Sequence, residues 1–294
     1  MLRHWKLALA LVVAGLLLWG LRTGTTPNTL YPILPSNANT ETSSPSTGQG
    51  IEIRGRVIWK GEKPLVPPMR RPMSPYYPLP DSVTPNPLSP VVSPANGLAD
   101  VFLVLDGPGV ERIPKIFPPV KVEWKGYDCE VSQGNRRGRF GLVRSGDDVE
   151  FVATDANFHS ARARGADFFT LMLSTINRPV KRVLNQAGMV EITSGTWFYW
   201  AQARLWVSPH EGCAITDAEG NFTLPNVPPG QYTLSAIRAN WNITGLEGDP
   251  EFPVPVRAKF APPVVLKQTI TVGKEPGETI RFEMNSDLFI KPGN

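Results

Sequence analysis

Hydrophobic and polar residues alternate along much of the chain after residue 50, and short turns rich in Gly, Pro, Asp and Asn interrupt the alternation. A period of two residues predicts half-buried strands, because successive side chains of a strand point to opposite faces. The clearest example is 214–234, AITDAEGNFTLPNVPPGQYTL, in which Phe222 and Leu224 alternate with polar neighbours between two Gly-containing turns. Gly adopts positive φ without steric cost, so these turns favour tightly connected antiparallel strands.

The same pattern predicts strands throughout the rest of the chain. They lie at Ile51–Trp59, 98–105, 120–124, 129–131, 140–143, Asp148–Ala153, Val180–Val183, 189–193, 197–207, 231–237, Val264–Val272 and 278–284. The apolar run 168–177, FFTLMLSTIN, is compatible with either one short helix or a buried strand. Many short strands between frequent turns are typical of a sandwich. We therefore predict an all-β, antiparallel sandwich and a smaller β-unit that begins near residue 208.

Proline changes this picture over 64–95, where it recurs every few residues. Proline removes a backbone donor, so this segment cannot form a central strand, and we interpret it as a loop wrapped around the outside of the sandwich. The chain holds 31 Pro and 26 Gly, which favours short strands and long loops over helices.

The N-terminus predicts a hydrophobic helix of a different kind. Arg3 and Lys6 precede the uncharged, mostly apolar run 7–21, and Arg22 follows it. Such a run is short for a membrane span and long enough for a signal peptide. We interpret 1–22 as an uncleaved membrane anchor, with a cleaved signal, and hence secretion, as the alternative. Basic residues before the run predict that the rest faces the periplasm or exterior.

A stalk is predicted between this helix and the strands. Residues 23–50 are rich in Thr, Ser, Asn and Pro and nearly uncharged, a composition too poor in apolar residues to pack. The stalk would hold the β-rich part away from a membrane. The formal net charge of +4 is too small for a nucleic-acid partner to be expected.

Two groups of residues are candidates for binding. Arg136, Arg137 and Arg139 lie in the Gly-rich loop QGNRRGRFG, where a solvated loop is the favoured interpretation and an anion or polysaccharide contact is the alternative. Trp197 and Tyr199 belong to an aromatic run whose alternate residues would face solvent and stack on sugar rings. Core packing of the whole run is the favoured interpretation.

Catalytic chemistry has little support in the sequence. No nucleophile, His and carboxylate form a recognisable motif, so we expect no catalytic residues and no enzyme. The two cysteines, Cys129 and Cys213, are either one disulfide or two buried thiols. Of the three His, His159 and His210 lie in the predicted β-rich region, and a structural role is favoured for both.

The motifs TDAEGNF and NVPPGQYTL within 214–234 resemble the carboxypeptidase regulatory-like domain, a transthyretin-like or Cna B-type prealbumin sandwich. A longer stretch, 51–234, resembles exported bacterial proteins, often found in planctomycetes, in which a cupredoxin-like domain precedes such a segment. GRVIWKGEKP, NGLADVFLVL, Cys129, the His159 region and HEGCAITD carry this resemblance. It implies a cupredoxin-like sandwich over 51–207, with its Pro-rich loop, and a regulatory-like β-unit over 208–288.

The same resemblance implies that the copper ligands are missing. Copper-competent members carry a His and a later C-x-I-H-x-W-M motif, which together supply the imidazole, thiolate and thioether ligands of a blue-copper centre. Counting back from HEGCAITD places the motif's Cys on Gly195, its His on Phe198, its Trp on Trp200 and its Met on Ala201. Only His159 remains, as a relic ligand. We expect no metal and no cofactor.

These observations favour a non-catalytic β-sandwich protein, anchored at the cell envelope, that acts as a structural or binding module outside the cytoplasmic membrane. Its expected partners are the membrane, through 1–22, and a polysaccharide or another envelope protein. A carbohydrate-binding module that uses Trp197, Tyr199 and the three arginines of 136–139 is the alternative. A copper electron carrier is disfavoured because its ligands are missing.

Overall fold

The structure is a computed structural model, and it describes residues 50–71, 82–113, 117–251, 254–273, 275, 277 and 279–289. Residues 47–294 form one compact unit. The predicted anchor, 1–22, and the predicted stalk up to residue 49 lie outside the described residues. Among the helices of the described part, none combines the length and the apolar character that a membrane span requires.

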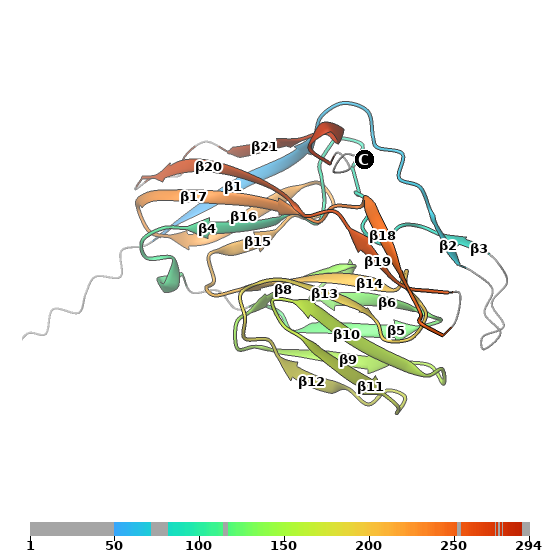
Figure 1. The fold of residues 1–294 in the computed structure, drawn as a ribbon. Helices are drawn as coiled ribbons and strands as arrows, with labels where there is room; N and C mark the ends of the chain where they lie inside the picture. The colour runs from blue at the N-terminus through green and yellow to red at the C-terminus, as the bar shows by residue number, and fades with distance from the viewer. Residues whose placement is uncertain are drawn as a thin grey trace, which may run out of the picture. The chain divides into compact units, whose positions relative to one another are not determined.

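A first β-sandwich contains strands from both ends of the described chain (Figure 1). Its two sheets have the strand orders β16-β1-β21 and β15-β4-β17-β20, and both contribute to one hydrophobic cluster. The strands are β1 (Ile51–Trp59), β4 (Phe102–Asp106), β15 (Cys213–Ile215), β16 (Asn221–Val227), β17 (Gly230–Arg238), β20 (Val264–Val272) and β21 (Ile280–Met284). At one end, Trp241 stacks on Phe289 with ring centroids 4.1 Å apart, and Trp59 packs against both rings.

A second β-sandwich is built from the residues between β4 and β15 (Figure 1). Its sheets have the orders β11-β10-β13-β14-β8 and β12-β9-β5-β6-β7, and a separate hydrophobic cluster lies between them. The strands are β5 (Val120–Lys125), β6 (Asp128–Gln133), β7 (Arg136–Gly138), β8 (Phe140–Arg144), β9 (Asp148–Ala153), β10 (His159–Gly165), β11 (Phe169–Leu173), β12 (Val180–Val183), β13 (Gly188–Ser194) and β14 (Gln202–Ser208).

The second sandwich is therefore inserted into the first, which differs from the predicted division near residue 208. The sandwich predicted over 51–207 includes Ile51–Trp59 and 98–105. Instead, β1 pairs antiparallel with β16 and parallel with β21, and β4 pairs with β15 and β17. Alternation along one strand shows that it has a buried face, and it does not show which distant strand will be its neighbour.

The all-β prediction is confirmed for the described residues, and β1, β9, β12 and β20 have the predicted bounds. Two details differ. The pairs β1–β21, β5–β9 and β8–β14 are parallel, so the sandwiches are mixed rather than purely antiparallel. The apolar run 168–177 contains β11, an edge strand with Leu171 and Leu173 buried and Met172 exposed.

Two short hairpins lie outside the sandwiches. The Pro-rich segment contains β2 (Met69–Arg71) and β3 (Ser82–Thr84), and its later part packs inward, with Leu88 fully buried. The hairpin of β18 (Ile243–Gly248) and β19 (Pro255–Phe260) extends from the first sandwich towards β14 of the second (Figure 1). Short 3-10 helices, η1 (Val110–Arg112) and η2 (Ser286–Phe289), complete the described elements.

Candidate functional site

His159, the first residue of β10, is hydrogen-bonded to Asp155 in the preceding loop. Its ring is fully buried, and Nε2 lies 2.7 Å from Oδ1 of Asp155. The other oxygen of Asp155 accepts a hydrogen bond from the backbone N–H of Gly126, at 2.6 Å. Burial alone would raise the pKa of Asp155, yet the hydrogen bonds from Gly126 and His159 hold it below its ordinary value. His159 thus fastens the loop before β10.

Gly195 and Phe198, the positions at which the resemblance implies copper ligands, are closely surrounded by other residues. The backbone N–H of Gly195 donates to the carbonyl of Ser160, and a Cβ on Gly195 would lie 2.3 Å from the Ser160 hydroxyl. Phe198 packs with ring centroids 4.8 Å from Tyr127 and 5.6 Å from Trp200. Within the described part, no group of three His, Cys, Asp or Glu could hold a metal ion. A copper centre does not fit these residues.

The aromatic run 197–200 forms a turn before β14 rather than the first half of a strand. Trp200 is buried, as expected, and its Nε1 donates to the carbonyl of Tyr127. Tyr199 is also buried, and its hydroxyl donates to the carbonyl of Arg70 on β2. Trp197 is half-buried and donates to the carboxylate of Asp249, 3.2 Å away. Trp197 and Tyr199 are therefore not presented together on an exposed surface.

The three arginines of the Gly-rich loop are separated by their ion pairs. Arg136 binds Asp100 at 2.7 Å, and Arg137 binds Glu130 at 3.2 Å. The guanidinium of Arg139 binds both carboxylate oxygens of Asp128, at 2.8 and 2.7 Å. These arginines occupy β7 and the residue before β8. Each guanidinium already has a carboxylate, so the structure does not assemble them into one anion site with Trp197.

The two cysteines lie in different hydrophobic clusters, Cys129 in the second sandwich and Cys213 in the first. Both are buried, and the structure does not join them in a disulfide. The alternative of two buried thiols therefore describes them. Burial raises the pKa of the Cys129 thiol from 9.0 to about 12, against the lowering effect of the nearby Arg139.

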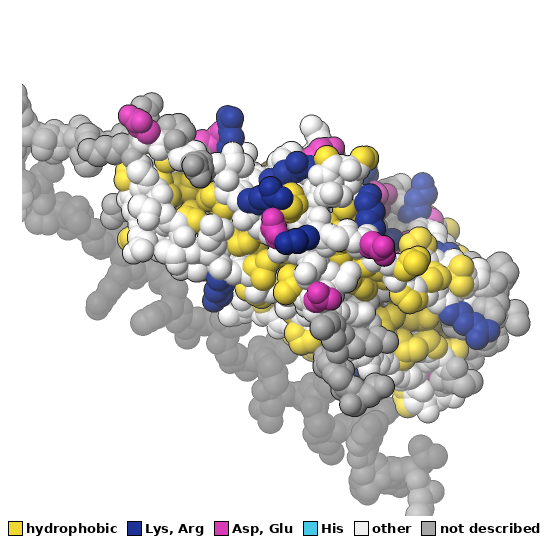
Figure 2. Space-filling model, turned by 90° about the horizontal axis from the view of Figure 1, so that it is seen from above, with side chains coloured by type: hydrophobic (Ala, Val, Ile, Leu, Met, Phe, Trp, Pro, Cys, Tyr) yellow, Lys and Arg dark blue, Asp and Glu magenta, His cyan; other side chains and the backbone are white. Residues whose placement is uncertain are grey.

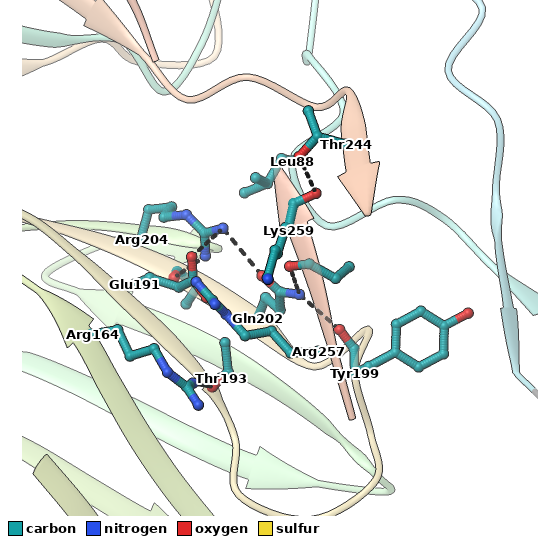
Figure 3. A network of polar contacts seen from close by, with 12 residues as sticks. Leu88, Arg164, Glu191, Thr193, Tyr199, Gln202, Arg204, Thr244, Arg257 and Lys259 are labelled. Carbon is teal, nitrogen blue, oxygen red and sulfur yellow. Dashed lines mark hydrogen bonds and ion pairs between the residues drawn. The ribbon is translucent and has the colours of Figure 1, made fainter. Parts of the chain in front are cut away.

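A cluster of arginines that sequence reasoning missed lies on the outer face of the second sandwich. Cross-strand pairing sets Arg164 on β10 opposite Glu191 on β13, and Glu191 opposite Arg204 on β14. Arg257, on β19 of the crossing hairpin, adds a fourth member to this row (Figure 3). Side chains two residues apart in a strand share a face, so Arg162 lies on the same face as Arg164.

Glu191 is the centre of this cluster. One carboxylate oxygen lies 2.7 Å from Nε of Arg257, and the other lies 3.4 Å from the guanidinium of Arg204. Arg257 also binds Glu247 at 3.1 Å, and Lys259 binds the same oxygen of Glu247 at 2.9 Å. Figure 3 shows these side chains converging from β13, β14 and β19. The contacts hold the β18–β19 hairpin against the sheet.

The two arginines at the ends of the row differ from Arg257 in their surroundings. The side chain of Arg204 is only 6% exposed, and its guanidinium lies 5.4 Å from the ring of Phe260. Arg164 donates to the hydroxyl of Thr193 at 3.3 Å, and within the described residues it has no ion pair. Burial lowers the pKa of both arginines, and the positive charge of Arg257 lowers that of each further. The cluster thus carries uncompensated positive charge.

A cavity of about 240 Å³ opens beside this cluster. Its lining includes Arg164, Arg204, Arg257 and Glu191, which are three cations and one carboxylate. The other lining residues are largely apolar, and they include Leu88, Met189, Phe260 and Pro262. Residues of both sandwiches therefore contribute to the lining. Its volume lies below the roughly 300–1,000 Å³ of common ligand pockets, so it suits a small molecule or a terminal group.

The residues of this cavity left a weak signal in the sequence. In β10, HSARARG, Ala161 and Ala163 are buried while Arg162 and Arg164 face outward. The residues of β10 alternate as in a strand, but the inward positions hold the small residue Ala instead of large apolar residues. The hydrophobic pattern therefore does not indicate this strand. The hairpin that brings Arg257 to Glu191 joins positions 66 residues apart in the sequence. Nothing in the local pattern indicates that contact.

The face in Figure 2 shows how charge is distributed more widely. Lys and Arg side chains are interspersed there with acidic, neutral and hydrophobic surface. This face therefore offers no broad basic surface of the kind that nucleic acids bind.

Comparison with known proteins adds a likeness in fold. No family model matches the chain, and no curated protein matches it. Part of the chain is similar to a solved structure described as a novel purple cupredoxin from Nitrosopumilus maritimus. The match covers 31% of this chain and 99% of that chain, with 14% sequence identity and a TM-score of 0.24. The two sandwiches of the described residues are established by their strand pairing.

Proposed function

We propose that this protein is a non-catalytic structural or binding module, held at the cell envelope by residues 1–22 and spaced from the membrane by 23–50. The observation that carries the proposal is the contact of Glu191 with both Arg204 and Arg257. This contact joins the β18–β19 hairpin of the first sandwich to β13, the middle strand of a sheet in the second sandwich. It therefore favours one rigid body. A rigid body on a stalk suits the presentation of a surface to a partner.

The state of the chemically capable residues supports a role without catalysis. His159 is engaged by Asp155, and the raised pKa of Cys129 favours an unreactive thiol. Phe198 and Gly195 stand where copper ligands are expected from the resemblance, and packing surrounds both of them. The carbohydrate-binding alternative has less support, because Tyr199 is buried and Trp197 is tied to Asp249.

Protease treatment of cells that produce the full chain tests the location. The proposal predicts that the chain sediments with the membrane fraction. A protease added from outside, after the outer envelope is opened, should remove the β-rich part while cytoplasmic marker proteins stay intact. A chain that is protected together with the cytoplasmic markers would contradict the proposal. A matched chain with residues 7–21 replaced by a cleavable signal should reach the same side without sedimenting.

A further inference from the structure

We propose that the cavity beside Glu191 binds a small organic carboxylate, with its carboxylate group on Arg164 and Arg204 and its apolar part on Phe260 and its neighbours. This inference names the ligand of the proposed binding module and rests on that proposed function. The charge, burial and shape of the cavity support it.

The cavity lining carries more positive than negative charge. Three guanidinium groups face one carboxylate, and Glu191 already divides its two oxygens between Arg257 and Arg204. The nearby Glu247 is occupied by Arg257 and Lys259. Among the described residues, the hydrogen-bond partner of Arg164 is a neutral hydroxyl, that of Thr193. One more anion would therefore complete the pairing of the row, and the cavity lies where that anion would sit.

The guanidinium groups and the apolar residues of the lining together restrict the kind of anion. A guanidinium presents a planar fork of donors that matches a carboxylate or a phosphate. In this cluster the bound partners are carboxylates, since Glu191 and Glu247 hold Arg257 from two sides. The cavity lining also includes the partly exposed apolar residues Met189 and Phe260, which an inorganic ion would leave uncovered. An ion with an apolar body would contact both the guanidinium groups and these residues, and the cavity volume restricts that body to a small one.

The burial of Arg204 favours a further anionic partner. Arg204 is almost fully buried with a shared carboxylate 3.4 Å away, and buried charges require close partners. Its other guanidinium contacts are the carbonyl of Ala203 and the side-chain oxygen of Gln202. A ligand carboxylate would supply the charge-assisted hydrogen bonds that these neutral groups cannot. Ligand binding should therefore stabilise the fold as well as occupy the cavity.

The test is calorimetric titration of the full chain, kept in mild detergent, with benzoate, with its neutral analogue benzamide and with inorganic phosphate. Benzoate should bind one site per chain. Benzamide should bind at least about tenfold more weakly because it lacks the charge that strengthens hydrogen bonds to the guanidinium groups. Phosphate should also bind at least about tenfold more weakly, because it leaves the apolar lining uncovered. Arg164→Gln should weaken benzoate binding by about tenfold or more. Arg164 is partly exposed, and within the part of the chain that the structure describes its hydrogen bond goes to Thr193, so this variant should keep its unfolding midpoint.

Arg162→Gln is the matched control, because Arg162 lies on the same strand and face but does not line the cavity. Its affinity for benzoate should stay within about threefold of that of the unchanged protein, since a charge outside the site acts only through screened long-range attraction. Equal binding of benzamide, tighter binding of phosphate, equal losses in the two variants, or no binding of benzoate would each overturn the inference. Recovery of a chemically altered benzoate would instead contradict the proposed non-catalytic function and leave the site intact.

Discussion

The guanidinium Nε of Arg257 on β19 lies 2.7 Å from a carboxylate oxygen of Glu191 on β13. This contact joins a hairpin that leaves the first sandwich to the middle strand of a sheet in the second. Both side chains are less than one-fifth exposed, so water screens the ion pair weakly. Glu191 also serves Arg204, so one carboxylate holds two cations in place.

Replacing this carboxylate should destabilise the protein measurably. Glu191→Gln leaves Arg204 and Arg257 without their shared anion, and the free energy of unfolding should fall by about 2–4 kcal/mol, since loss of one partner leaves a buried charge uncompensated. Glu247→Gln is the control. The Glu247 side chain is 34% exposed, and its loss should cost about 1 kcal/mol or less. Urea unfolding measures both, and equal losses would contradict the central place of Glu191.

Acid should remove the contribution of Asp155. Because its folded-state pKa is lowered, the stabilisation is complete above the ordinary pKa of an aspartate, 3.8, and is lost as the pH falls through the lowered value. Asp155→Asn should therefore be less stable than the unchanged protein at neutral pH, by about 1–3 kcal/mol. The difference should shrink towards zero as the pH falls through the lowered pKa of Asp155. Thermal unfolding across this range measures it, and a difference that grows in acid would show that the sign is wrong.

The Cys129 thiol should resist alkylation. The thiolate is the form that reacts with an alkylating agent. Because the pKa of Cys129 is raised from 9.0 to about 12, almost none of the native thiol is ionised at about pH 9. A raised pKa also means that its contribution to stability is complete below about pH 9 and is lost as the pH rises towards about 12. Peptide mass spectrometry after iodoacetamide treatment should find Cys129 unmodified in native protein and modified in urea. Equal modification rates would contradict this account.

Gly195 should not accept a side chain. A Cβ there would lie 2.3 Å from Oγ and 2.9 Å from Cβ of Ser160, so Gly195→Ala should cost about 1–3 kcal/mol of stability as an overpacked position. Gly248→Ala is the control, because nothing lies within 4 Å of a Cβ there. If the two variants have the same unfolding midpoint, the close approach of Gly195 to Ser160 is not present in solution.

The elements of this fold were largely readable from the sequence, because their alternation is local. β1 and β20 have large apolar residues on one face, and their predicted bounds agree with the structure. β10 was missed because its inward residues are the small Ala161 and Ala163. The bounds of β14 were also misjudged, since the aromatic residues before Gln202 pack as a turn.

The candidate site was not readable from the sequence. Arg164, Glu191 and Arg257 lie on three strands, and they come together only when the hairpin crosses the sheet. The sequence instead pointed to the local run at Arg136–Arg139 as an alternative anion contact, and its members bind three different carboxylates. Proximity along the chain was a poor guide because successive side chains of a strand point to opposite faces and reach separate partners. The resemblance singled out His159 and Phe198, but it did not predict that His159 would bind Asp155 or that Phe198 would pack against Tyr127.

Copper analysis of the full chain tests the central claim, a structural or binding role in place of electron transfer, most directly. After incubation with one equivalent of copper and desalting, metal analysis should find background copper, and no visible thiolate-to-copper absorption should appear, because Phe198 and Gly195 supply no ligands. Retention of one copper per chain, with an intense visible band that disappears in His159→Ala, would contradict the account.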